Sequence, residues 1–152
     1  MTHFERYARQ MALPGFGTEG QTALSESLVL VVGAGGVGCG ALPLLAASGI
    51  GKIAIVDGDI VTESNLHRQT LYSPGQIGAM KARAAADALS TLNPDCEISY
   101  YARFFEDSAE FCALVESASI CIDATDSFRS RGVVSTVCER AGKPEIFASA
   151  QG

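Results

Sequence analysis

The feature that most constrains the fold of this chain is a glycine-rich turn placed directly after an apolar run. Residues 28–32 are all Leu or Val, and the next six read Gly33-Ala34-Gly35-Gly36-Val37-Gly38. A strand that turns sharply into a helix uses glycine there, because a missing Cβ lets a phosphate approach the backbone. The helix that follows offers free N–H groups and the positive end of its dipole to that anion. The turn therefore predicts a nucleotide site in a Rossmann-like fold.

An acidic residue follows the next apolar run at the spacing of a ribose ligand. Asp57 comes directly after residues 52–56 and nineteen residues after Gly38. An acid about 20 residues beyond the glycine turn accepts hydrogen bonds from a ribose hydroxyl, so we expect this role for Asp57. The G-x-G-x-x-G pattern alone is more typical of nicotinamide or flavin cofactors than of ATP. A dehydrogenase domain and an ATP site both remain open at this point.

Apolar runs and amphipathic segments alternate along the rest of the chain. This pattern predicts an α/β fold with a mostly parallel, Rossmann-like sheet and helices on both faces, preceded by N-terminal helices. The expected strands cover residues 28–32, 52–56, 97–102, 119–124 and 145–148. The expected helices cover residues 4–13, 18–25, 37–48, 76–92, 108–116 and 127–141. We expect residues 1–26 to form a helical arm and residues 27–152 to form the nucleotide-binding domain.

The charge balance and the cysteines exclude several classes of protein. Lys and Arg number 11 against 17 Asp and Glu, and the net charge of −6 is the wrong sign for a DNA-binding surface. No apolar run reaches the ~20 residues of a membrane helix, and the first residues lack the apolar segment of a signal peptide. The five cysteines are dispersed without a C-x-x-C pair, which indicates neither disulfides nor a zinc site. We expect a cytoplasmic protein with no DNA or membrane partner.

Polar groups beyond the glycine turn favour ATP over a redox cofactor. The segment Ser64-Asn65-Leu66-His67-Arg68-Gln69 brings an amide and a guanidinium close to the end of the second strand. Lys81 lies early in a predicted helix that starts near the same edge, and a lysine ammonium is a compact charge suited to a phosphate. Asp126 follows the fourth strand, where a carboxylate can hold Mg²⁺ together with phosphate oxygens. A hydride-transfer site does not require this combination of amide, cationic and carboxylate groups.

In order and spacing, these motifs resemble the ThiF/MoeB/HesA family of ubiquitin-activating-enzyme-like adenylyltransferases. The matching segments are Arg6-Tyr7-Ala8-Arg9-Gln10, the glycine turn, Asp57-Gly58-Asp59, Ser64 to Gln69, Lys81 and Asp123-Ala124-Thr125-Asp126. The resemblance implies that the C-terminal glycine carboxylate of a ubiquitin-like sulfur-carrier protein, ending in Gly-Gly, attacks the α-phosphorus of ATP. The products are an acyl-adenylate and pyrophosphate. A carboxylate is already ionised at neutral pH, so this reaction needs no general base.

The resemblance also implies roles for individual residues. It places the backbone of Gly33, Gly35, Gly36 and Gly38 against the phosphates, Asp57 on the ribose, Asn65, Arg68 and Lys81 on the phosphates, Asp126 on Mg²⁺, and Asp59, Ser64 and Ser127 among the other nucleotide contacts. Arg9 is expected to reach the partner subunit's site as an arginine finger, which implies a homodimer. The implied catalytic residues are Arg9, Arg68, Lys81 and Asp126. Relatives add a carrier-binding part, often with a zinc-binding C-x-x-C pair, that this chain does not contain.

Other interpretations of the same residues stay open. A relative in this family could activate a carboxylate on a tRNA or a small molecule, such as a threonylcarbamoyl group. A dehydrogenase domain is supported only by the glycine turn and Asp57, and a non-catalytic scaffold would not need the clustered cations. Without the motifs, Arg9 and Lys81 would be read as solvated faces of amphipathic helices. Asp59 could cap a turn, and Asp123 could serve only to stabilise the turn before Asp126.

Overall fold

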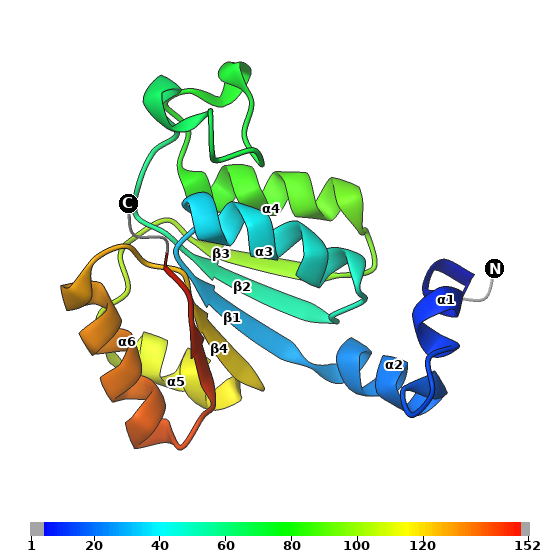
Figure 1. Ribbon diagram of the computed structural model, residues 1–152. Helices are drawn as coiled ribbons and strands as arrows, with labels where there is room; N and C mark the ends of the chain where they lie inside the picture. Colours follow the sequence, from blue (N-terminus) through cyan, green and yellow to red (C-terminus); the bar gives the residue numbers. More distant parts are fainter. Residues whose placement is uncertain (1–4, 150–152) are drawn as a thin grey trace.

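The computed structural model describes residues 5–149 and has a five-stranded sheet at its centre (Figure 1). The strands are β1 (Leu28–Val32), β2 (Lys52–Val56), β3 (Glu97–Tyr101), β4 (Ile120–Asp123) and β5 (Glu145–Phe147). Their order in the sheet is β3-β2-β1-β4-β5, and each pair of neighbours is parallel. The predicted parallel α/β fold is confirmed.

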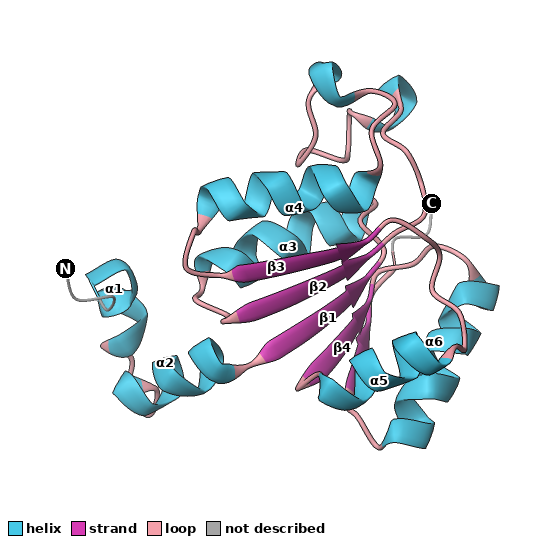
Figure 2. Ribbon diagram, turned by 180° about the vertical axis from the view of Figure 1, so that it is seen from behind, coloured by secondary structure: helices cyan, strands magenta, loops and turns pink. Residues whose placement is uncertain are grey.

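Two layers of helices cover the sheet (Figure 2). One face carries α3 (Gly36–Ala47) and α4 (Lys81–Leu92), and the other carries α5 (Ala109–Ser117) and α6 (Phe128–Ala141). Alternate residues of β1 enter the two cores, with Val29 and Val31 on the α3 side and Leu30 and Val32 on the α6 side. Because both faces of the central strands are covered, β1 is wholly apolar and β2 is apolar from residue 53 to residue 56.

The strand order places a crevice at the carboxyl edge of the sheet. From β1 the chain moves outward to β2 and β3, then returns to the other side of β1 to form β4 and β5. The loops after β1 and β4 therefore diverge to opposite faces. Ligands of open α/β sheets bind at such a switch point, outside the carboxyl ends of the strands. Among the described residues, this edge gathers the glycine turn, the segment after β2 and the loop that carries Asp126.

An N-terminal arm, comprising η1 (Glu5–Tyr7), α1 (Ala8–Met11) and α2 (Gly17–Glu26), lies beyond the opposite, amino edge of the sheet (Figure 1, dark blue). It is fixed there by buried polar contacts. Asn93 Nδ2 donates to Tyr7 Oη at 2.9 Å and to the carbonyl of Ala46 at 2.7 Å. The predicted single helix over residues 4–13 is instead one short 3-10 turn followed by one α-helical turn, and residue 4 lies outside the described residues.

The predicted helix over residues 76–92 begins later than expected, at Lys81. Residues 74–76 form a separate 3-10 turn, and Gly78 has a φ of +89°, which no continuous helix allows. The backbone around Val61 pairs with this stretch: the N–H of Val61 donates to the carbonyl of Ala79, and the N–H of Gly78 donates to the carbonyl of Val61. A contact distant in sequence thus delays the helix and makes Lys81 its first residue.

The other predicted elements are present, with ends that differ by at most one residue. Ser108 and Ser127 cap α5 and α6 by accepting backbone N–H groups three residues later, and Gly142 ends α6 in the left-handed conformation. Over residues 5–149, no helix combines the length and apolar character needed to cross a membrane.

Candidate functional site

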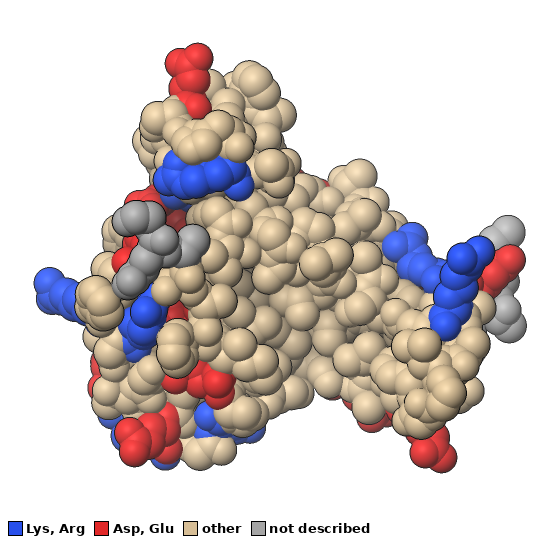
Figure 3. All heavy atoms as spheres, viewed as in Figure 1, with Lys and Arg blue, Asp and Glu red and all other residues tan. Residues whose placement is uncertain are grey.

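A cleft of about 630 Å³ opens at the carboxyl edge of the sheet, between the loops that follow β1, β2 and β4. Its polar lining includes most of the residues predicted to bind nucleotide: Gly33, Gly35, Gly36, Asp57, Asp59, Asn65, Arg68, Lys81 and Asp126. Figure 3 shows lysine and arginine side chains near this edge and on the N-terminal arm, with a broad uncharged surface between them. The cleft lining combines the cations Arg68, Lys81 and Arg131 with the acids Asp57, Asp59 and Asp126.

Two of the four glycines are needed for packing within the protein. A Cβ on Gly33, whose φ is +97°, would lie 2.8 Å from the carbonyl carbon and oxygen of Ala124. A Cβ on Gly38 would lie 2.2 Å from the carbonyl oxygen of Gly33. Gly38 does not line the cleft, so its role in the structure is the close approach of α3 to the end of β1.

The other two glycines leave open space facing the cleft. Beside Gly35 the nearest atom to an added Cβ is Gln69 Nε2 at 3.7 Å, and beside Gly36 it is Arg68 Cδ at 3.8 Å. Both contacts are with side chains, at ordinary van der Waals distances. The first turn of α3 therefore exposes its backbone N–H groups where an anion can approach them.

Asp57 holds the glycine turn in place. One of its carboxylate oxygens accepts the N–H of Ala34 at 2.7 Å, and the other accepts the N–H of Asp59 at 2.8 Å. Burial raises the pKa of this carboxyl, although these two N–H donors partly offset the effect. The sequence predicted a ribose ligand, and the structure adds that Asp57 connects the ends of β1 and β2.

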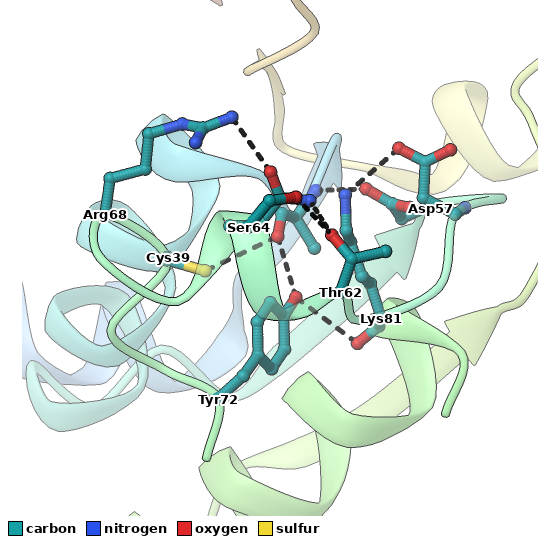
Figure 4. Close-up of polar contacts among 10 residues, drawn as sticks. Cys39, Asp57, Thr62, Ser64, Arg68, Tyr72 and Lys81 are labelled. Carbon is teal, nitrogen blue, oxygen red and sulfur yellow. Dashed lines mark hydrogen bonds and ion pairs between the residues drawn. The ribbon is translucent and has the colours of Figure 1, made fainter. Parts of the chain in front are cut away.

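Tyr72 supports the same turn from behind. Its hydroxyl donates to the carbonyl of Ala34 at 2.7 Å, and Cys39 Sγ lies 3.4 Å from the same oxygen (Figure 4). Burial raises the pKa of Tyr72 far above its usual range, so its hydroxyl keeps its proton and remains a donor. The backbone of Ala34 is therefore fixed through both its N–H and its carbonyl.

Lys81 reaches the cleft as the first residue of α4 and is only 4% exposed. Its Nζ lies 3.0 Å from Oδ2 of Asp59, and its backbone N–H donates to the carbonyl of Asp59 at 2.9 Å. A buried ammonium needs such a partner. Asp59 therefore fixes the direction of the lysine side chain and leaves its own carboxylate half exposed to the cleft.

The segment after β2 presents its amide and guanidinium as one hydrogen-bonded group. Asn65 Nδ2 donates to Thr62 Oγ1 at 2.7 Å, and Arg68 Nη2 donates to Asn65 Oδ1 at 3.1 Å (Figure 4). Both Asn65 and Arg68 line the cleft. Ser64 is exposed, lies near Thr62 and does not belong to the cleft lining.

The loop after β4 separates two aspartates into different environments. Asp126 is exposed and lines the cleft, whereas Asp123 is fully buried and accepts the N–H of Thr125 at 2.8 Å. Ser127 lies outside the lining and caps α6 by accepting the N–H of Ser130 at 3.0 Å. Of the two acids, Asp126 is the one placed to meet a ligand.

Several cleft residues carried no assignment from the sequence. Gln69 belongs to the matching segment that begins at Ser64, but no role was predicted for it. Its side chain is buried, and its Oε1 has no hydrogen-bond partner among the described residues. Arg131 and the aromatic residues Phe104, Phe105 and Phe128 also line the cleft. No local sequence signal distinguishes Arg131, because it lies one turn inside an ordinary helix.

Arg9 does not share the cleft of its own chain. It is exposed on α1, at the amino edge of the sheet, while the cleft lies at the carboxyl edge. A five-residue strand separates the two edges by about 16 Å. Within one chain, Arg9 therefore takes no part in the candidate site.

The acidic residues of the cleft fit Mg²⁺ better than a metal with a full set of protein ligands. Within residues 5–149 there is no group of three or more His, Cys, Asp or Glu side chains arranged to hold an ion. Mg²⁺ is typically held by one or two carboxylates, with phosphate oxygens and waters completing its octahedron. The exposed carboxylate of Asp126 meets that requirement.

A Rossmann-like sheet with a glycine turn, two open glycines and a cation-bearing cleft at its carboxyl edge defines a nucleotide-binding protein. The chain belongs to the ThiF family, whose model matches residues 7–152. The family expected from the sequence motifs is therefore confirmed.

Individual relatives agree with this assignment. The chain is 42% identical over 153 residues to the adenylyltransferase and sulfurtransferase UBA4 of Eremothecium gossypii. The alignment covers 100% of this chain and 34% of that protein. It is 40% identical over 145 residues to the molybdopterin-synthase adenylyltransferase of Escherichia coli. This alignment covers 95% of this chain and 58% of that protein. The chain thus spans between a third and three-fifths of the length of these relatives.

Solved structures show the same fold. The E. coli tRNA N6-threonylcarbamoyladenosine dehydratase TcdA, in complex with ATP, superposes with a TM-score of 0.87 at 29% identity. The match covers 98% of this chain and 60% of that chain.

Proposed function

We propose that this chain is the ATP-binding part of an adenylyltransferase that activates the C-terminal glycine carboxylate of a ubiquitin-like sulfur-carrier protein. The observation that carries the proposal is the cleft itself, which brings Asn65, Arg68, Lys81 and Asp126 to the open side of the glycine turn. Two relatives with 40–42% identity are named adenylyltransferases, and a structural neighbour binds ATP.

The residues divide the work of binding a triphosphate. The N–H groups beside Gly35 and Gly36 meet phosphate oxygens, Arg68 and Lys81 supply positive charge, and Asn65 orients Arg68. Asp126 would hold Mg²⁺, which neutralises charge on the phosphates when bound. The attacking carboxylate is already ionised, so the site acts by positioning and by electrostatic stabilisation rather than by proton transfer.

The proposal includes a homodimer with shared sites, and Arg9 provides its test. Arg9→Ala should lower adenylate formation by at least ~100-fold, because an arginine finger stabilises transition-state charge. Mixed with a Lys81→Ala subunit, it should recover about a quarter of wild-type activity, since half of the random dimers then contain one complete site. Activity is measured by ATP/pyrophosphate exchange in mixtures of the two variants. A mixture no more active than either variant alone argues against a shared site.

We place the protein in the cytoplasm. All five cysteines are free thiols, and four of them lie in the core: Cys39, Cys96, Cys121 and Cys138. Burial raises the pKa of each of these four thiols, which keeps them protonated and unreactive. Such thiols are typical of a reducing compartment.

A second candidate substrate is a carboxylate carried by a tRNA. It is favoured by the TM-score of 0.87 with the tRNA-modifying dehydratase TcdA. The higher identity to the molybdopterin-synthase adenylyltransferase, 40% against 29%, favours the carrier protein.

The deciding experiment is ATP/pyrophosphate exchange with candidate carriers that end in Gly-Gly. We expect exchange that requires both Mg²⁺ and one such carrier, and no exchange when the carrier lacks its last glycine. Exchange driven only by threonylcarbamoylated tRNA would select the second candidate. Tight binding of a reduced nicotinamide cofactor, with no binding of Mg-ATP, would contradict both.

A further inference from the structure

Arg131 connects three elements behind the loop that carries Asp126. Its Nε lies 3.7 Å from Oδ2 of Asp123, the last residue of β4, and its Nη2 donates to the carbonyl of Thr125 at 3.1 Å. The guanidinium also lies over two aromatic rings, 5.8 Å from the centroid of Phe128 and 5.3 Å from that of Phe147. One side chain thus joins the end of β4, the loop, α6 and the end of β5.

The loop held by Arg131 is also held from its other side. The N–H of Ala124 donates to the carbonyl of Val32 at 2.8 Å, and the backbone at Ala124 packs against Gly33 with no room for a Cβ. Thr125 is held at its N–H by Asp123 and at its carbonyl by Arg131. Asp126 follows directly, and its exposed side chain lines the cleft.

Arg131 lines the cleft, but its guanidinium is engaged by groups of the protein itself. Its side chain is only 18% exposed, against 0% for Asp123. Both Asp123 Oδ2 and Arg131 Nε lack a hydrogen-bond partner among the described residues, so each is the main electrostatic partner of the other. Removing one member of such a pair is strongly destabilising, because it leaves the other as a buried charge without a counter-charge.

We propose that Arg131 is a positioning residue that sets the place of the Asp126 carboxylate, and with it the affinity of the site for the Mg²⁺ of Mg-ATP. The proposal rests on the proposed function, in which Asp126 holds that metal. Residues that orient a metal ligand without touching the metal commonly change metal affinity by about 10- to 100-fold when they are mutated.

The test measures binding of Mg-ATP and of metal-free AMP to the chain by calorimetry. Arg131→Ala should raise the Mg²⁺ concentration for half-saturation, at fixed ATP, by at least ~10-fold. Its affinity for AMP in EDTA should stay within about twofold, because no metal is then present for Asp126 to hold. Arg131→Lys should recover part of the loss, since it keeps the charge facing Asp123 but lacks the planar fork of donors. The control is Arg129→Ala, an exposed arginine in the same turn of α6.

The possible outcomes separate the two proposals. If the wild-type chain does not bind Mg-ATP, the proposed function and the role of Arg131 fail together. If it does, an unchanged Mg²⁺ midpoint in Arg131→Ala, or an equal loss of Mg-ATP and AMP binding, overturns the positioning role alone. If Arg131→Ala does not fold, the double variant Asp123→Asn, Arg131→Leu removes the unpaired charge, and a wild-type Mg²⁺ midpoint there overturns the proposal.

Discussion

Asp126→Ala should reduce Mg²⁺-dependent adenylate formation by at least ~100-fold while leaving the fold intact. Asp126 is the acid of the β4 loop that is exposed in the cleft, whereas Asp123 is buried behind it. Under the proposed function this carboxylate is the protein's ligand to Mg²⁺, and a metal that neutralises phosphate charge contributes several kcal/mol to the transition state. The measurement is ATP/pyrophosphate exchange as a function of Mg²⁺ concentration.

Measurements of stability and of a matched variant distinguish a loss of Mg²⁺ binding from a loss of folding. Because Asp126 is exposed, its replacement should change the free energy of unfolding by less than about 0.5 kcal/mol. Asp87→Ala removes the same charge from an exposed position on α4 and should retain full activity. Unchanged exchange in Asp126→Ala, or an equal loss in Asp87→Ala, would remove Asp126 from the site.

The fold could be predicted because the pattern that specifies it is local. Residues 28–32 and 53–56 are uninterrupted apolar runs, and such runs between amphipathic segments predict a parallel sheet that is covered on both faces. Once the sheet is parallel, topology alone brings the residues after its strands to one edge. That is why Asn65, Arg68 and Asp126, far apart in the sequence, could be expected in one cleft.

What the sequence could not predict depends on contacts between distant segments. The start of α4 at Lys81 is set by the pairing of residues 78–79 with Val61. The hydrogen bond from the N–H of Ala34 to Asp57 depends on how the glycine turn orients that N–H group. Arg131 reads as an ordinary helix residue until the fold places it beside Asp123.

The four glycines illustrate the same limit. The motif predicts one role for all four, as positions where a phosphate meets the backbone. In the structure, Gly35 and Gly36 have room beside them, whereas Gly33 and Gly38 have backbone atoms where a Cβ would stand. The distinction depends on how closely α3 approaches β1, and the spacing of residues in the sequence does not determine that distance.

That distinction leads to the second large expected effect, that of Gly38→Ala. An added Cβ would stand 2.2 Å from the carbonyl oxygen of Gly33, which is rigid backbone that cannot rotate away. We expect a loss of about 3 kcal/mol in the free energy of unfolding, the cost of forcing extra volume into a packed site. We also expect a weaker affinity for Mg-ATP, because α3 must shift relative to the glycine turn. Chemical denaturation and calorimetry measure the two quantities.

The matched control lies two residues further along the same helix. Gly40 has no atom within 4 Å of its added Cβ and is exposed, so Gly40→Ala should stabilise the protein by about 0.5–1 kcal/mol through its better helix propensity. The same substitution should thus have opposite signs at two neighbouring positions of α3. If both variants unfold at the same denaturant concentration, helix propensity alone governs both positions, and the close approach of α3 to β1 is not what requires Gly38.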